Sequence, residues 1–181
     1  IKSALASCDR NIAVSAGSAR QISEMESTKK IAVIPNAIDI SAFEKMPERS
    51  EKLNGDGTIR LLFVGATGKL KGELDLIRAL QTLKQHDPPL KVSLLGYGAE
   101  DLDQTGIGHM VEHLGAVPLD ERLAFYEMAD IFVLPTYAEA MPISVIEAMA
   151  AGLPVITTPV GGIPEILDDE CEGYLCPVGD H

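Results

Sequence analysis

The amino-acid sequence predicts an α/β fold, a Rossmann-like parallel sheet with helices on both faces. Short runs rich in β-branched residues alternate with amphipathic stretches of helical length, which is the pattern of successive βαβ units. The clearest helical stretch covers residues 72–86, where apolar side chains recur at helical spacing between charged ones. We therefore expect one face of this helix to pack on the sheet.

Eight short apolar runs are predicted to be strands. They cover residues 12–15, 31–34, 61–65, 92–96, 111–117, 131–135, 155–158 and 174–176. Since amphipathic segments separate most of them, we expect crossover connections and parallel pairing.

The 181 residues, 46% of them hydrophobic, are enough for one sizeable core. We expect a single compact domain overall, divided into three parts. Residues 1–43 form a lead-in from an interdomain region, and residues 44–58, charged and without periodicity, form a surface connection. Residues 59–181 form the core of the domain. Because the chain begins at Ile1 without an initiator methionine or leader, we interpret it as a piece of a longer protein.

Composition narrows the possible partners. The net charge is −12, and no Lys/Arg cluster follows a helix, so we expect no nucleic-acid binding. The apolar runs are far shorter than the roughly 20 residues that span a bilayer. Three cysteines, Cys8, Cys171 and Cys176, have neither metal-ligand nor redox spacing, and free thiols favour a reducing, cytoplasmic location. Peripheral attachment of the full-length protein to the inner face of the membrane stays open.

The most informative segment covers residues 129–167. It predicts a strand at 131–134, a loop at 135–141, a helix that opens at Pro142 and stops at Gly152, and another buried strand. The loop and the helix start then lie at the carboxyl edge of the sheet, where ligands of open α/β sheets bind. Free N–H groups at a helix start favour an anion such as phosphate.

Two glutamates flank this helix start. Glu147 is the only charged residue between positions 143 and 152, and a lone buried carboxylate is costly, so we expect it to face a cleft. With Glu139, it could accept hydrogen bonds from the hydroxyls of a sugar nucleotide. Simpler interpretations stay open, namely a helix-dipole contact for Glu139, and solvent exposure or a basic partner for Glu147.

The two glutamates, separated by seven residues, are followed by Gly-Leu-Pro-Val at 152–155 and Gly-Gly-Ile-Pro-Glu at 161–165. This arrangement resembles the group 1 (family four) glycosyltransferases. Further segments match in order across nearly the whole chain. They are residues 34–39 with Phe43, residues 63–65 with Lys71-Gly72, residues 94–98 and residues 114–117. The resemblance implies the C-terminal, donor-binding half of a two-domain GT-B fold.

The resemblance also implies roles for residues of this chain. Lys71 contacts the donor diphosphate and Glu139 holds the donor sugar, so these two are the catalytic candidates. Glu147 accepts from the ribose hydroxyls. For Lys71 alone, a solvated surface lysine is the competing interpretation. The full donor-binding set is Gly65, Lys71, Val117, Glu139, Ala140, Met141, Pro142, Ile143 and Glu147.

The implied activity is that of a hexosyltransferase. It transfers a sugar from a nucleotide donor, UDP- or GDP-linked, to an acceptor hydroxyl with retention, in polysaccharide or glycolipid assembly. No metal or other cofactor is expected, because the diphosphate is bound electrostatically. An acceptor glycan or glycolipid binds to the absent N-terminal domain, so we expect this piece alone to bind donor weakly and to catalyse nothing.

The chain departs from the family pattern at two positions. Ala66 stands where members usually place arginine, with Lys69 as a hypothetical substitute, and Ala140 stands where many have glycine. Two other functions stay open: a nucleotide-sugar epimerase of the same fold, and a non-catalytic nucleotide-sugar-binding module, which the loss of an arginine at Ala66 favours. A dehydrogenase is disfavoured, because Asp101 takes the third glycine position after 96–98.

Overall fold

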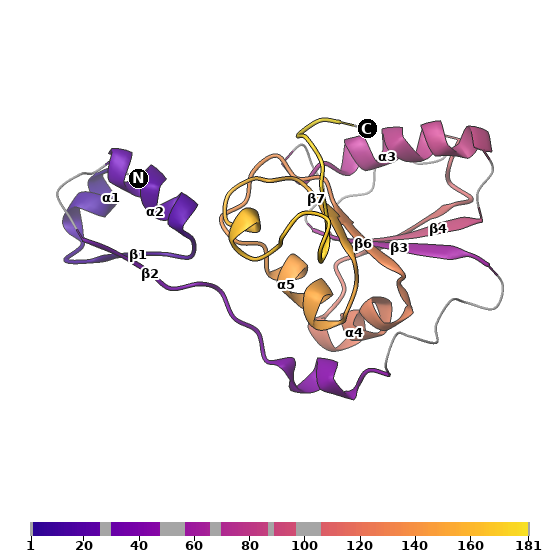
Figure 1. Cartoon of the computed structure of the whole chain (residues 1–181), viewed down its shortest axis with the longest axis horizontal. Helices are drawn as coiled ribbons and strands as arrows, with labels where there is room; N and C mark the ends of the chain where they lie inside the picture. Colours follow the sequence, from indigo (N-terminus) through magenta and orange to yellow (C-terminus); the bar gives the residue numbers. More distant parts are fainter. Residues whose placement is uncertain are drawn as a thin grey trace.

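The computed structural model describes residues 2–25, 30–47, 57–65, 70–86, 89–96 and 106–180. Six parallel strands form one sheet in the order β5-β4-β3-β6-β7-β8 (Figure 1). They are β3 (Ile59–Val64), β4 (Leu90–Leu95), β5 (Val111–Gly115), β6 (Ile131–Leu134), β7 (Val155–Thr157) and β8 (Gly173–Leu175). The expected α/β class and parallel sheet are confirmed, and each predicted strand has a counterpart within a few residues.

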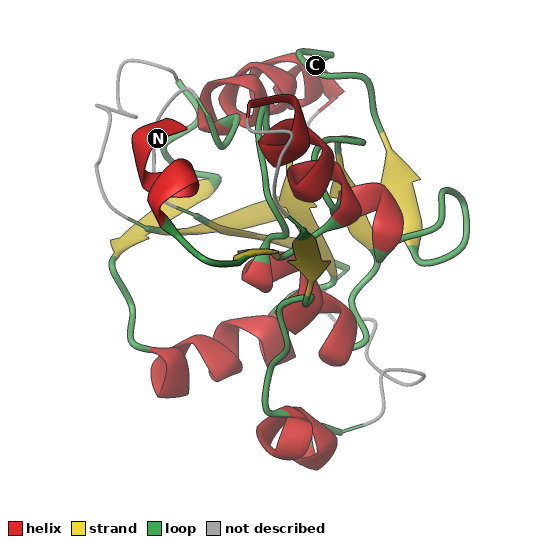
Figure 2. Ribbon diagram, turned by 90° about the vertical axis from the view of Figure 1, so that its left-hand side faces the viewer, coloured by secondary structure: helices red, strands yellow, loops and turns green. Residues whose placement is uncertain are grey.

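The strand order reverses once, between β3 and β6. From β3 the chain moves outward through β4 to β5, then returns to β6 on the other side of β3 and continues to β7 and β8. Right-handed crossovers then place helices on opposite faces. Figures 1 and 2 show α3 (Glu73–Leu83) on one face and α4 (Leu119–Met128) and α5 (Ile143–Ala150) on the other.

The core fills the space between the sheet and the helices on both of its faces, and an aromatic cluster lies on the α4 side. Phe63 and Phe132 are fully buried, and the ring of Tyr126 stacks on Phe132 with centroids 6.1 Å apart. Phe43 meets the other side of Tyr126 edge-on. Phe43 belongs to the 3-10 helix η1 (Ile40–Lys45), whose start is capped by Asp39. The segment before β3 is therefore anchored to the core by one aromatic side chain.

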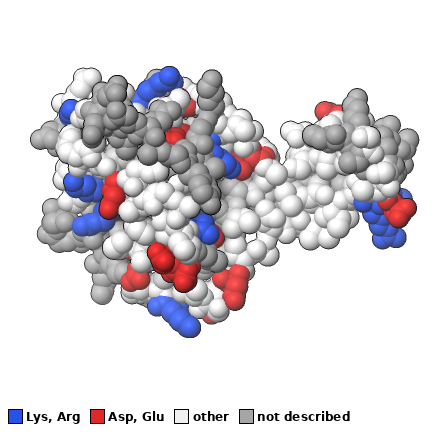
Figure 3. All heavy atoms as spheres, turned by 180° about the vertical axis from the view of Figure 1, so that it is seen from behind, with Lys and Arg blue, Asp and Glu red and all other residues white. Residues whose placement is uncertain are grey.

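The first part of the chain forms a second, smaller sheet. It contains α1 (Lys2–Ser7), β1 (Asn11–Ala13), α2 (Ala16–Met25) and β2 (Ile31–Val33), and β1 pairs with β2 in parallel. Figure 1 shows this βαβ unit standing apart from the six-stranded sheet, with an extended stretch leading from β2 to η1. On the face drawn in Figure 3, a narrow waist joins the two, and the described Lys and Arg side chains are interspersed with acidic ones.

Gly72, just before α3, is required by close packing between neighbouring loops. Its φ is +75°, and a Cβ atom there would lie 1.8 Å from the carbonyl oxygen of Pro135. Gly57 has a similar φ of +70° with nothing within 4 Å of the added atom. Substitutions at the two glycines therefore separate the free-energy cost of a left-handed backbone from the cost of a steric clash.

We expect Gly57→Ala to lower the free energy of unfolding by about 1 kcal/mol through backbone strain alone. Gly72→Ala should lower it by about 3 kcal/mol, since the backbone of Pro135 must also move. Urea unfolding followed by circular dichroism measures both values. Equal losses in the two variants would contradict the packing argument.

Candidate substrate-binding site

The candidate site lies at the carboxyl ends of β3 and β6. These strands are neighbours, yet their connections leave to opposite faces of the sheet. Such a reversal opens a crevice at the carboxyl edge, where ligands of α/β sheets bind. On one side of the crevice, Gly65 follows the last residue of β3, and the described chain resumes at Leu70, ahead of α3. The residues after β6 supply the other side, ahead of α5.

A lysine from one side of this crevice pairs with a glutamate from the other. The Lys71 Nζ donates to Glu139 Oε1 at 2.5 Å. The Lys71 side chain is 30% exposed and that of Glu139 is 8% exposed. The ammonium group has further hydrogens to donate, and Glu139 keeps its second oxygen to accept. Lys71 is therefore a half-buried, paired lysine rather than a solvated surface one, and the pair offers donors and acceptors to one ligand.

The loop that carries Glu139 is tied to the β3 side by its backbone. The hydroxyl of the buried Thr136 and the N–H of Tyr137 both donate to the carbonyl of Leu70, each at 2.8 Å. The hydroxyl of Thr158, after β7, donates to the carbonyl of Thr136. These bonds fix Leu70, and hence the adjacent Lys71, with respect to Glu139.

Two more contacts support the same loop from behind. Gly161 packs so closely on it that an added Cβ would lie 1.6 Å from the carbonyl oxygen of Glu139, at a φ of +59°. The side-chain amide of Asn36, in the extended stretch after β2, donates to the carbonyl of Met141 at 2.8 Å. The glutamate is thus presented by a loop with little freedom to move.

Glu147 is buried in the second turn of α5, with 3% exposure. Its Oε2 accepts a hydrogen bond of 2.7 Å from the hydroxyl of Tyr126 on α4, and the Arg122 guanidinium lies 3.8 Å from it. Burial, and then the negative charge of Glu147, raise the pKa of Tyr126, so the phenol stays a donor. Of the interpretations left open for Glu147, solvent exposure is wrong, a basic partner is present in Arg122, and the hydrogen bond from a tyrosine is an addition to both.

The start of α5 has no side-chain cap among the described residues. Its N-cap residue is Pro142. The first N–H groups of a helix lack partners within the helix, and their position at the crevice suits an anion. The helix lies where the sequence predicts it, and Gly152, with a φ of +69°, follows its end.

The remaining predicted positions lie beyond the carboxyl ends of β3, β5 and β6. The Gly65 N–H donates to the carbonyl of Leu95, and a Cβ at Gly65 would lie 3.5 Å from the Lys71 stem. Ala140 and Ile143 are exposed, Met141 and Pro142 are buried, and Val117 is half-buried after β5. Ala66 and Lys69 lie outside the described residues. The structure thus brings Gly65, Lys71 and Glu139 together and places Val117 at the same edge.

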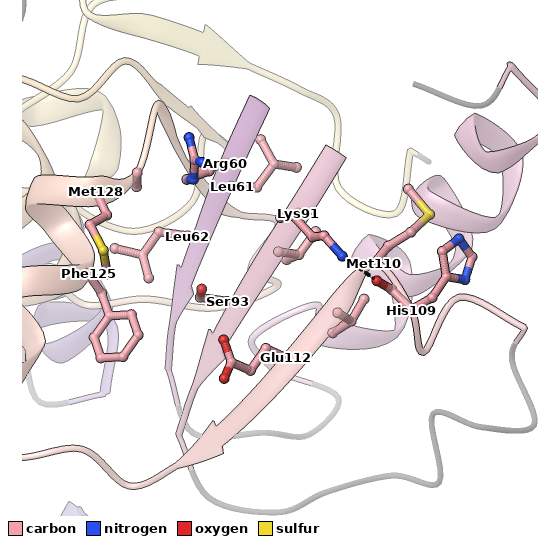
Figure 4. A pocket seen from close by; sticks show the side chains of 13 residues that line it. Arg60, Leu61, Leu62, Lys91, Ser93, His109, Met110, Glu112, Phe125 and Met128 are labelled. Atoms are coloured by element: carbon pink, nitrogen blue, oxygen red, sulfur yellow. Dashed lines mark hydrogen bonds between the residues drawn. The ribbon is translucent and has the colours of Figure 1, made fainter. Parts of the chain in front are cut away.

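A cavity of about 540 Å³ adjoins Glu139, between its loop, residues 160–161 and helix α2. Another groove, of about 440 Å³, lies between α4 and strands β3 to β5. Figure 4 shows Arg60, Lys91 and His109 around that groove, with Lys91 donating to the His109 carbonyl. Because that groove meets the amino-terminal half of the strands, the cavity beside Glu139 is the better ligand site.

The fold and the crevice at its reversal point define a Rossmann-like α/β protein whose candidate ligand site lies at the carboxyl edge of its sheet. Solved structures share the fold. The chain matches sucrose-phosphate synthase from Thermosynechococcus elongatus with a TM-score of 0.84 and 24% identity, over 99% of this chain and 48% of that one. It matches Anabaena HepE in complex with UDP and glucose with a TM-score of 0.79 and 20% identity, over 96% and 50%.

Sequence comparison gives the family. Residues 44–181 match the profile of "Glycosyl transferases group 1", and the chain belongs to this family. A D-inositol 3-phosphate glycosyltransferase of Arthrobacter sp. (strain FB24) is 32% identical over 80% of this chain and 38% of its own length. The amylovoran biosynthesis glycosyltransferase AmsK of Erwinia amylovora is 34% identical over 67% and 33%. The chain therefore spans well under half of these relatives.

The fold is accordingly one Rossmann-like half of the GT-B architecture, as the resemblance implied. None of the helices within the described ranges combines the length and apolar character needed to cross a bilayer.

The Tyr126–Glu147 bond is testable by removing one hydroxyl. We expect Tyr126→Phe to lower the free energy of unfolding by about 1.5–3 kcal/mol, because a buried carboxylate loses its donor. Tyr174→Phe is the matched control, since Tyr174 is 61% exposed, and it should change stability little. Urea unfolding measures both, and equal small effects would show that the bond contributes nothing.

Proposed function

We propose that this chain is the donor-binding half of an enzyme that transfers a sugar from a nucleoside diphosphate to an acceptor hydroxyl. The observation that carries the proposal is the Lys71–Glu139 pair beside the open start of α5, at the reversal point of the sheet. The pair combines a cation, suited to a diphosphate, with a carboxylate, suited to sugar hydroxyls.

In the proposed reaction, the bond between the anomeric carbon and the diphosphate oxygen breaks, and its electron pair stays on the diphosphate. The acceptor oxygen bonds to the anomeric carbon with retention, and its proton passes to the departing diphosphate oxygen. Lys71 and the N–H groups at the start of α5 stabilise the charge that develops on the leaving group. In this proposal they take the place of a metal ion, so no metal or other cofactor is required.

The two glutamates hold the two ends of the donor. Glu139 accepts from hydroxyls of the transferred sugar through the oxygen that Lys71 leaves open. Glu147 accepts from the ribose, since Tyr126 binds its Oε2 and leaves Oε1 for a second donor. Tyr126 then orients the Glu147 carboxylate while satisfying its buried charge.

The comparisons support a choice of donor and pathway. Two of the structural neighbours are described in complex with UDP and glucose, and with UDP and GlcNAc. A relative acts in amylovoran biosynthesis. We therefore propose a UDP- or GDP-linked hexose as donor, and a glycan or glycolipid acceptor held by an N-terminal domain. The exposed thiol of Cys171, which forms no disulfide, favours the cytoplasm as the compartment.

Titration calorimetry with UDP, GDP and ADP tests the proposal on this chain. We expect one nucleotide to bind, and Lys71→Ala to weaken its binding about tenfold by removing a charge-assisted contact with the diphosphate. Glu147→Gln, which keeps an oxygen for Tyr126, should weaken it less. Lys84→Ala is the control, because Lys84, just after α3, donates to the Gly106 carbonyl instead.

Equal binding in the Lys71→Ala and Lys84→Ala variants would contradict the assignment of the site. Wild-type protein that binds none of the three nucleotides would contradict a donor-binding role for the chain. Product analysis on the full-length protein then separates the remaining alternatives. A glycosylated acceptor supports the transferase, an altered nucleotide sugar supports the epimerase, and unchanged donor supports the non-catalytic module.

A further inference from the structure

A carboxylate of the large sheet domain accepts two hydrogen bonds from the small N-terminal unit. Glu165, the last residue of the 3-10 helix η5 (Ile163–Glu165), lies beside the first turn of α2. Its Oε2 accepts from the N–H of Ala16 and its Oε1 from the N–H of Gly17, each at 2.9 Å. Both oxygens are used on two consecutive donors at a helix start, which is the favourable place for a negative charge.

The two parts of the chain pack closely around these hydrogen bonds. A Cβ at Gly17 would lie 3.0 Å from the carbonyl oxygen of Gly161, and a Cβ at Gly162 would lie 2.7 Å from the Cβ atom of Ser15. The Gly162 N–H in turn donates to the carbonyl of Ala140 at 2.9 Å. The start of α2 thus rests on the segment that supports the Glu139 loop.

The contact between Glu165 and α2 is electrostatic rather than apolar. Hydrogen bonds from Ala16 and Gly17 lower the pKa of the Glu165 carboxyl, so the group is ionised at neutral pH. Glu165 is exposed, and water screens its attraction to the helix start. The main effect of the contact is therefore on the placement of α2 and not on overall stability.

That placement gives the cavity beside Glu139 a second wall. Ser18 and Gln21 of α2 line it across from Glu139. They are three residues apart, so they lie on the same face of the helix. The Ser18 Oγ accepts from the Ser15 hydroxyl at 2.9 Å and keeps its own hydrogen to donate. A hydroxyl and a carboxamide opposite a carboxylate suit a ligand with several hydroxyl groups.

We propose that Glu165 is a positioning residue that holds α2 over this cavity, so that Ser18 and Gln21 contact sugar hydroxyls opposite Glu139. The inference rests on the proposed function, because Glu139 is taken as the contact of the transferred sugar. The hydroxyls can belong to the sugar of the donor or to the acceptor, and both have the same chemistry.

The test compares ligands with and without the sugar on the same chain. Calorimetry gives the affinities for UDP and UDP-glucose, or for the corresponding pair where GDP or ADP is the nucleotide that binds. NMR titration gives the affinity of the nucleotide-saturated chain for free glucose as a separate hydroxyl ligand. We expect Gln21→Ala and Glu165→Gln to leave UDP binding unchanged. Both substitutions should weaken the binding of either the nucleotide sugar or free glucose about threefold to tenfold. Glu24→Gln, an exposed carboxylate of α2 outside the cavity lining, is the control.

The two sources of hydroxyls give different results. Weaker binding of UDP-glucose assigns the wall to the donor sugar, whereas weaker binding of free glucose alone assigns it to the acceptor. Glu165→Ala should have a larger effect than Glu165→Gln, because an amide oxygen can still accept one of the two hydrogen bonds. Hydrogen exchange at Ala16 and Gly17 should be faster in both Glu165 variants than in the control.

Unchanged binding of both sugar ligands, or unchanged exchange at Ala16 and Gly17, would overturn this inference while UDP binding upholds the proposed function. Failure of the wild-type chain to bind UDP, GDP or ADP would overturn the proposed function and this inference together.

Discussion

The reversal of strand order between β3 and β6 is the constraint on which the site depends. Because their connections leave to opposite faces, the ends of two adjacent strands open onto one crevice. The loop after β6 donates two hydrogen bonds to the carbonyl of Leu70, on the other side of the crevice. These bonds hold the charged side chains of the two sides close to each other. The approach of Lys71 to Glu139 is therefore a consequence of sheet topology, and a different strand order would separate them.

Glycine makes this close packing of loops possible. The contacts of Gly72 with Pro135 and of Gly161 with Glu139 leave no room for a side chain. Both glycines also have positive φ, so two separate requirements exclude other residues. One contact joins the loop after β6 to the start of α3, and the other backs the loop with the segment after β7. The position of the Glu139 carboxylate is set by main-chain packing on both sides.

Local patterns in the sequence predicted the strands and α5 well, because β-branched runs and the Pro142 and Gly152 boundaries carry strong local signals. The tyrosine that donates to Glu147 is not predicted by any local pattern in the sequence. Tyr126 lies on α4, 21 residues earlier in the chain, and apolar periodicity marks it only as a core residue. The sequence places Glu165 in the Gly-Gly-Ile-Pro-Glu motif but indicates no partner for it, since its partners are backbone N–H groups and every residue except proline has one.

The N-terminal βαβ unit meets the large domain through polar contacts. Glu165 holds Ala16 and Gly17, and Asn36 reaches the carbonyl of Met141. Such contacts exchange readily with water, because each one replaces hydrogen bonds that the solvent also offers. A large apolar interface would hold α2 more tightly. The few polar bonds seen here orient α2 through their geometry and add little to overall stability, because water competes for the same donors and acceptors.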